Sequence, residues 1–233
     1  MSFRYRDASQ GDAVLGNSNM RAALFLPFIL LLAQSQCSAQ TESVPAAPEK
    51  GGNEIQVWVG GGHSVGGRET LFSNGPGQPA FDGGNHNTSV LNAGLRYGWI
   101  LTGPHLPSLL RGRFEYAVDA VPAFLAFQPA NTAYGVGFDP LILKWNFERR
   151  GRFSPYFELT GGVLRTNHDV PTGTNTVNFM DQAALGTHIL GAKYNWSLEF
   201  RFMHISNAGL ATPNPGLNTV QVRLGVGKFF VRK

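Results

Sequence analysis

The chain has 233 residues, of which 42% are hydrophobic and 15% charged, with a formal net charge of +4. This length fits a leader segment followed by one domain. The positive charge is not gathered into a polybasic run, so the sequence predicts no nucleic-acid partner. A single cysteine excludes a disulfide-stapled scaffold.

The N-terminus is typical of an export signal. Arg21 precedes an apolar run over residues 22–33, which is shorter than the roughly 20 residues that a membrane-spanning helix needs. A basic residue followed by such a run indicates a secretory signal peptide. We predict that residues 1–39 form an N-terminal extension and a cleaved signal peptide, with Met1 and Met20 both open as the true start.

Residues 40–53 are rich in Pro, Ala, Glu and Gly and predict a short flexible lead-in. A lipid anchor on Cys37 is the alternative to simple cleavage. It is disfavoured because the bulky Gln36 stands where a lipidation site has a small residue. Residues 54–233 are predicted to form the folded domain.

From Glu54 onward, apolar residues recur with period two and no helical periodicity is evident. In the last such run, for example, Val220, Val222 and Leu224 alternate with Gln221 and Arg223. The alternation predicts eight strands, within residues 55–60, 91–99, 113–120, 134–147, 156–165, 178–192, 194–206 and 219–231.

Both a soluble β-sandwich and a transmembrane β-barrel alternate in this way. The export signal, strands of about 9–11 residues and a rhythm of long and short connections favour the barrel. We therefore predict an all-β fold, an eight-stranded antiparallel transmembrane β-barrel with both termini in the periplasm. The expected long outer loops are 63–87, 123–133, 166–177 and 207–218, the expected short turns are 148–153 and 192–193, and 103–112 is an exception.

Aromatic residues near the strand ends are expected to form the girdles found at both membrane interfaces. The alternative is that they fill the core of a sandwich. The expected girdle residues are Tyr97, Trp99, Tyr134, Trp145, Tyr156, Tyr194 and Trp196.

The strand over residues 194–206 ends in candidate catalytic residues. His204 and Ser206 continue an apolar series that includes Phe200 and Phe202, and side chains two apart point to the same face. Their Cβ atoms are expected roughly 6.5 Å apart, within reach of the hydrogen bond that activates a serine. The alternative is a polar strand end without chemistry.

The motif over residues 204–209, His-Ile-Ser-Asn-Ala-Gly, is followed by Pro-Asn-Pro-Gly over 213–216. It resembles the signature of the outer-membrane lipid A 3-O-deacylases, the PagL family. The resemblance implies that His204 is the general base, Ser206 the nucleophile, and Asn207 with a backbone N–H near Gly209 the oxyanion donors. Glycine at 209 also permits the sharp backbone turn that such donors need.

The chain departs from the family at the third catalytic position. The family has a glutamate where Asn218 stands here. Asparagine accepts a hydrogen bond from the imidazole and holds its tautomer but supplies no charge. Glu199 is close in sequence, but its parity places it on the lumen face. We therefore expect either a neutral catalytic triad or an inactive relative.

The expected function is hydrolysis of an ester-linked acyl chain of lipid A, in the bacterial outer membrane. The partners are the lipid A of lipopolysaccharide and outer-membrane lipids, with no cofactor and no metal. Two alternatives stay open: a non-enzymatic structural or adhesive barrel, and a lipid acyltransferase. The arginines at 149, 150 and 152 are expected to be solvated in a periplasmic turn, with contacts to lipid phosphates as the alternative.

Overall fold

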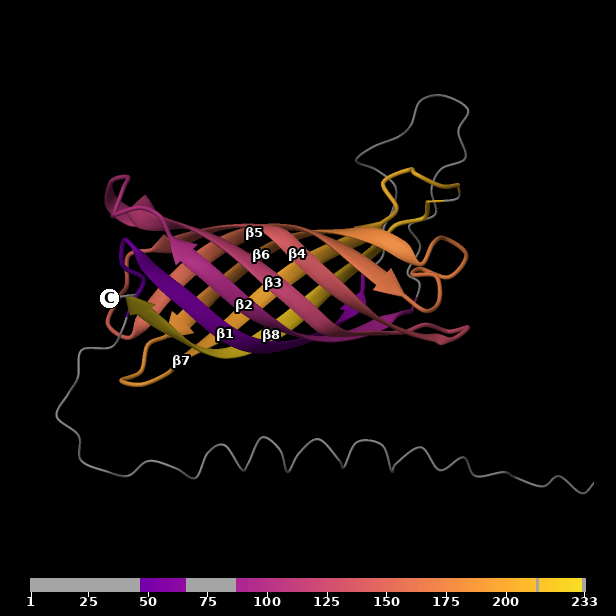
Figure 1. Ribbon diagram of the computed structural model, residues 1–233, viewed down its shortest axis with the longest axis horizontal. Helices are drawn as coiled ribbons and strands as arrows, with labels where there is room; N and C mark the ends of the chain where they lie inside the picture. Colours follow the sequence, from indigo (N-terminus) through magenta and orange to yellow (C-terminus); the bar gives the residue numbers. More distant parts are fainter. Residues whose placement is uncertain (1–46, 66–86, 213, 232–233) are drawn as a thin grey trace, which may run out of the picture. The chain divides into compact units, whose positions relative to one another are not determined.

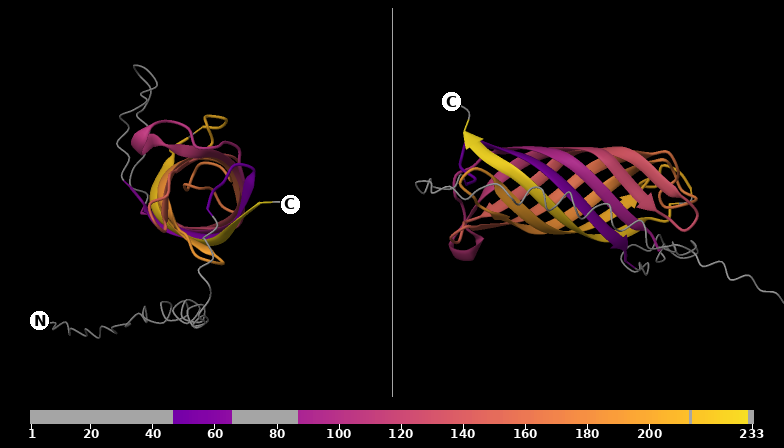
Figure 2. Two further views of the ribbon diagram at one scale, coloured as in Figure 1. Left: turned by 90° about the vertical axis from the view of Figure 1, so that its left-hand side faces the viewer. Right: turned by 90° about the horizontal axis from the view of Figure 1, so that it is seen from below.

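The computed structural model describes residues 47–65, 87–212 and 214–231, so the predicted signal peptide and most of the lead-in lie outside the described residues. The strands form one closed antiparallel barrel (Figures 1 and 2), which confirms the predicted fold. The elements in chain order are β1 (Gly52–Ser64), β2 (Ser89–Ile100), the 3₁₀ turn η1 (Ser108–Leu110), β3 (Gly112–Phe127), β4 (Thr132–Phe147), β5 (Phe153–Thr166), β6 (Val177–Ile189), β7 (Asn195–Ser206) and β8 (Leu217–Val231).

Each strand pairs with its neighbour in sequence, and β8 pairs with β1 from Gly52↔Val231 to Ser64↔Thr219. Closure leaves no sheet edge, which is what a sheet in hydrocarbon requires. Within the described part of the chain, no helix is long and apolar enough to cross a membrane. We call the end of the barrel where β7 finishes the site end, and the end where β8 finishes the C-terminal end.

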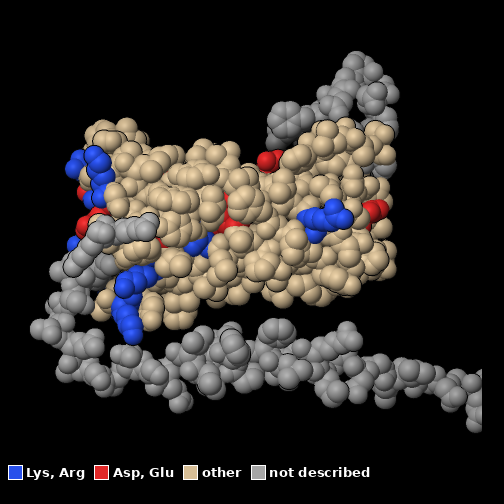
Figure 3. All heavy atoms as spheres, viewed as in Figure 1, with Lys and Arg blue, Asp and Glu red and all other residues tan. Residues whose placement is uncertain are grey.

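The predicted alternation sorts the side chains between an apolar outer wall and a polar lumen. Ile55, Val57 and Val59 are about half exposed, and Val220, Val222 and Leu224 behave in the same way. Lys and Arg side chains gather at the C-terminal end, and few charged atoms are visible on the wall between the ends (Figure 3). An apolar wall around a polar interior is the arrangement of a membrane-spanning barrel.

Two expectations about the strands were wrong. The expected long loop at 123–133 is a connection over residues 128–131, because β3 continues to Phe127 and β4 begins at Thr132. Tyr156 is not a girdle residue: it is 2% exposed, points into the lumen and donates a hydrogen bond from its hydroxyl to Glu199. The other expected girdle residues lie on the outer face, including Trp99, which stacks on Tyr116.

The middle of the lumen is filled by a network of buried charges. Arg96 donates to Asp119 from Nε at 2.8 Å and to Glu158 from Nη2 at 2.8 Å. Arg201 bridges Glu158 and Glu199, which confirms the predicted lumen position of Glu199. Opposite charges with bidentate hydrogen bonds offset the cost of burial.

Apolar side chains close the lumen at both ends. Ile100, Leu190 and Phe229 form a small cluster at the C-terminal end. A larger cluster at the site end contains Val90, Phe124, Ala126, Ala133, Leu164, Val170, Met180, Met203, Ile205 and Leu217. The interior of this narrow barrel is therefore packed with side chains and is not a pore.

Replacing Arg96 by alanine should destabilise the barrel by about 3 kcal/mol, because it leaves Asp119 and Glu158 short of a buried partner. The measurement is denaturant unfolding of the refolded barrel. Arg165→Ala is the matched control, since Arg165 is exposed and forms no ion pair among the described residues. Equal losses in the two variants would contradict the role given to the network.

Candidate active site

The structure brings His204 and Asn218 together on the outer wall. The two residues are paired in register between β7 and β8, and His204 Nδ1 lies 2.7 Å from Asn218 Oδ1. Because an amide oxygen only accepts, Nδ1 carries the hydrogen of this bond. Asn218 thereby leaves the lone pair on Nε2, the nitrogen that a general base would use.

Ser206 ends the same strand and is 8% exposed. His204 and Ser206 have the parity of the outward-facing Phe200 and Phe202, whereas Met203 and Ile205 pack into the lumen cluster. Among the described residues, the hydrogen-bond partner of the imidazole is Asn218 and not Ser206. Catalytic hydrogen bonds are often long without substrate and tighten when it binds.

Gly216 makes room for the imidazole. A Cβ at this position would lie 2.3 Å from Cε1 of His204 and 3.0 Å from Nε2. Ile205 pairs with Leu217, and the next residues along the two strands are Ser206 and Gly216. The ring of His204 therefore leans over the glycine on the side where Ser206 lies, with Cε1 as the ring atom nearest to it.

The loop after β7 begins with a tight turn. The N–H of Leu210 donates to the carbonyl of Asn207 at 3.0 Å, and both central residues have positive φ, 53° at Ala208 and 77° at Gly209. Two central residues with positive φ define a type I′-like turn, which glycine tolerates and alanine resists. Non-glycine residues in this strained conformation concentrate at functional sites.

The expected oxyanion donors are engaged inside this loop. The Asn207 N–H donates to Oδ1 of Asn214 at 3.0 Å, and the Gly209 N–H donates to Oδ1 of Asn207 at 2.9 Å. The Asn207 amide group also donates to the carbonyl of Ala211. Asn214 was missed by the sequence reasoning as a site residue, although it lies in the Pro-Asn-Pro-Gly segment that carries the resemblance.

Asp181 is a second residue that the sequence reasoning missed. It pairs with His204 across β6 and β7, on the side of the histidine away from Asn218, and it is exposed on the outer wall. Cross-strand partners have Cβ atoms about 4.5–5.5 Å apart. A carboxylate on a lipid-facing wall is energetically costly, and ionisable residues in such places often belong to functional sites. The alternation of the sequence predicts that Phe179, Asp181 and Ala183 share the outer face of β6. Only the register between β6 and β7 places Asp181 beside His204.

The described residues contain a hydrogen-bonded imidazole–hydroxyl pair elsewhere on the same wall. His63 Nδ1 lies 3.0 Å from Ser89 Oγ, and both residues are at the site end of β1 and β2. Among the described residues, His63 has no side-chain partner on the far side of the ring, unlike His204 with Asn218. No group of three His, Cys, Asp or Glu side chains suited to a metal ion occurs in the part of the chain that the structure describes.

The fold and this geometry define the chain as a small transmembrane β-barrel with a histidine and a serine at one rim. The family model described as lipid A 3-O-deacylase (PagL) matches residues 91–227, more than half of the chain. The chain therefore belongs to the PagL family, as the resemblance of its motif predicted.

The crystal structure of a PagL enzyme agrees on the fold. The crystal structure of the outer membrane enzyme PagL is 19% identical, with a TM-score of 0.53, over 73% of this chain and 97% of that one. The outer membrane protein OprG from Pseudomonas aeruginosa is 12% identical, with a TM-score of 0.44, over 79% and 98% of the two chains. No curated protein matches the chain.

Replacing Gly216 by alanine should displace the His204 imidazole and lower ester hydrolysis on the order of 10²-fold, because misplacing a catalytic group by about 1 Å has an effect of that size. Activity on lipid A is measured beside the unfolding midpoint. Gly161→Ala is the control, since a Cβ there meets nothing closer than 3.8 Å. Full activity in folded Gly216→Ala would rule out this positioning role.

Proposed function

We propose that the chain is a serine-type lipid A deacylase that hydrolyses an ester-linked acyl chain, by family resemblance the chain at the 3-position. The observation that carries the proposal is the His204–Asn218 hydrogen bond of 2.7 Å beside Ser206, on the outer wall of a barrel of the PagL family. A lipid substrate can reach this wall by lateral diffusion within the membrane.

In the proposed reaction, Ser206 Oγ attacks the ester carbonyl carbon while its proton passes to Nε2 of His204. The tetrahedral intermediate collapses when the bond from its carbon to the sugar oxygen breaks and the imidazolium gives its proton to that oxygen, which leaves an acyl-serine and a free sugar hydroxyl. Water then attacks the acyl-serine with His204 again as the base; the bond to Ser206 Oγ breaks, Oγ takes the proton back from His204, and the fatty acid leaves. This sequence of steps needs no cofactor.

The developing oxyanion would be bound by N–H groups of the loop after β7. In the structure, the N–H groups of Asn207 and Gly209 already donate to Asn214 and Asn207. We propose that the ester carbonyl replaces these side-chain acceptors when substrate binds. Donors held in place by the turn need little rearrangement, which is the physical basis of oxyanion stabilisation.

Asp181 is the proposed source of the negative charge that Asn218 lacks. Asn218 fixes the tautomer from β8, and Asp181 faces the same histidine from β6. A carboxylate across the strand favours the imidazolium that forms when Ser206 gives up its proton. The two tasks that one glutamate performs in the family would thus be divided between two residues.

We propose that the protein is exported by the N-terminal signal and lies in the outer membrane with the site end in the outer leaflet. Lipid A would then meet His204 and Ser206 from the side. The even strand count places both ends of the barrel chain at the opposite, C-terminal end, which would face the periplasm.

Expression in a lipid A-producing outer membrane should remove one hydroxyacyl mass from lipid A, and Ser206→Ala should abolish the change because it deletes the nucleophile. Mass spectra of extracted lipid A, with free fatty acid measured in parallel, provide the test. Ser89→Ala is the matched control, because it deletes the hydroxyl of another serine that lies beside a histidine on the same wall.

The products also separate the two other functions. Transfer of the acyl chain to a second lipid, with no free fatty acid, would identify an acyltransferase. Lipid A unchanged by the inserted wild-type barrel would contradict the enzyme and favour a structural or adhesive barrel.

Asp181→Asn should lower kcat/KM by roughly tenfold or more, since an unscreened charge across a strand stabilises an imidazolium by a few kcal/mol. Asn218→Glu should raise hydrolysis in the wild type and restore much of the activity of Asp181→Asn, because it returns a charge to the imidazole. Steady-state kinetics of the double-mutant cycle measure the coupling. Strictly additive effects would contradict the shared role of the two positions.

A further inference from the structure

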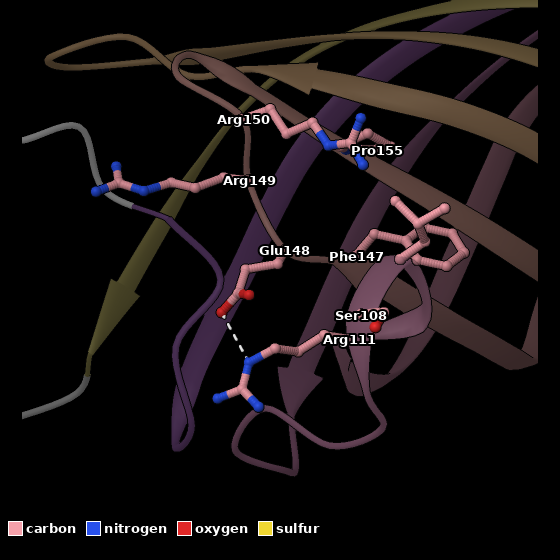
Figure 4. Close-up of a pocket in the computed structure, with 8 residues that line it drawn as sticks. Ser108, Arg111, Phe147, Glu148, Arg149, Arg150 and Pro155 are labelled. Carbon is pink, nitrogen blue, oxygen red and sulfur yellow. Dashed lines mark hydrogen bonds and ion pairs between the residues drawn. The ribbon is translucent and has the colours of Figure 1, made fainter.

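A cavity of about 580 Å³ lies at the C-terminal end of the barrel, away from the candidate active site. It is formed where the connection between β2 and β3 leans over the ends of β4 and β5 (Figure 4). Phe147 and Pro155, which have the parity of the outer wall, supply apolar surface, and Leu109 adds to it. Ser108, Arg111, Glu148, Arg149 and Arg150 are the polar residues that line it.

The overhanging connection is held against the barrel by specific bonds. Trp145 donates its indole N–H to the carbonyl of Leu110 at 3.1 Å, and the N–H of Glu148 donates to the carbonyl of Arg111 at 2.8 Å. Leu106 and Ser108 have positive φ, 65° and 53°. Non-glycine residues keep this conformation only where the surroundings impose it, and such residues concentrate at functional sites.

The guanidinium groups at the cavity have unused hydrogen-bonding capacity. Arg111 is half exposed and contacts Glu148 through Nε at 3.2 Å. Its terminal Nη groups, and the whole side chains of Arg149 and Arg150, have no partner among the described residues. In Figure 4, Arg150 extends toward Pro155, whereas Arg149 points away from Phe147. Three guanidiniums beside one carboxylate give the cavity a positive balance, and planar guanidiniums bind phosphate by paired hydrogen bonds.

The apolar side of the cavity lies near features that are typical of a membrane interface. Leu109 is 74% exposed and Leu110 is 59% exposed, at a place where most connections of a barrel are polar. Trp99 and Tyr116 stack with ring centroids 5.7 Å apart on the neighbouring strands, as in an interfacial aromatic girdle. Exposed leucines beside arginines fit acyl chains on one side and headgroups on the other.

We propose that this cavity binds the phosphodiester headgroup of an anionic glycerophospholipid. The phosphate would accept hydrogen bonds from Arg111 and Arg150, and the first part of an acyl chain would lie along Leu109 and Phe147. With the candidate active site in the outer leaflet, the bound lipid belongs to the periplasmic leaflet. The bound lipid would hold the barrel at a defined depth and tilt in the membrane, from the end opposite to the candidate active site.

Native mass spectrometry of the full-length protein in detergent, titrated with phosphatidylglycerol, tests the proposal. We expect one retained lipid per wild-type barrel and at least tenfold weaker retention in the double variant Arg111→Gln/Arg150→Gln. Leu109→Ser should also weaken retention, because the acyl chain loses its contact. Arg165→Gln makes the same substitution at one arginine of the site end and should retain lipid as the wild type does.

Inorganic phosphate, titrated in the same way, distinguishes a lipid from a free anion. We expect it to bind at least tenfold more weakly than phosphatidylglycerol, because it cannot use the apolar surface. Equal binding of the two would overturn the lipid assignment. Unchanged lipid retention in the double arginine variant, with an unfolding midpoint like that of the wild type, would overturn the site itself. None of these readouts depends on ester hydrolysis.

Discussion

Every N–H and C=O group of a strand in hydrocarbon must find its partner within the protein. In this chain the requirement is met by closing β8 onto β1, so that each strand has two hydrogen-bonded neighbours. Closure fixes which side chains face lipid and which face the lumen, since a shift of one residue would reverse every side chain of a strand. The buried charges and the candidate active site both follow from that fixed parity.

β7 shows how one strand serves both faces. Glu199 and Arg201 belong to the charge network in the middle of the lumen, and Met203 and Ile205 belong to the apolar cluster at the site end. The intervening residues face outward and end in His204 and Ser206. Packing on the inner face therefore holds the backbone that presents the candidate catalytic side chains, which is the support that a preorganised site needs.

The strands and their faces were predictable because alternation is a local property of the sequence. Their ends were less so: β3 and β4 run past the expected loop at 123–133, since Ala126 and Ala133 point into the apolar cluster and so extend the sheet. Tyr156 was misplaced for a different reason. An aromatic residue near a strand end has the position of a girdle residue. The parity of Tyr156, however, places its side chain in the lumen, where its hydroxyl bonds to the carboxylate of Glu199.

The sequence by itself determined the class of fold, the family resemblance and the choice of His204, Ser206 and Asn218 as candidate site residues. Period-two alternation and a short motif are local patterns, and each can be recognised within one or two strands. Only the tertiary structure decided which residues surround them. Asp181 and Gly216 lie 23 and 12 positions from His204 in the chain, and their nearness depends on the register between strands and on a missing Cβ. The cavity at the opposite rim likewise exists only where β2–β3 and β4–β5 connections meet, a contact that no local pattern encodes.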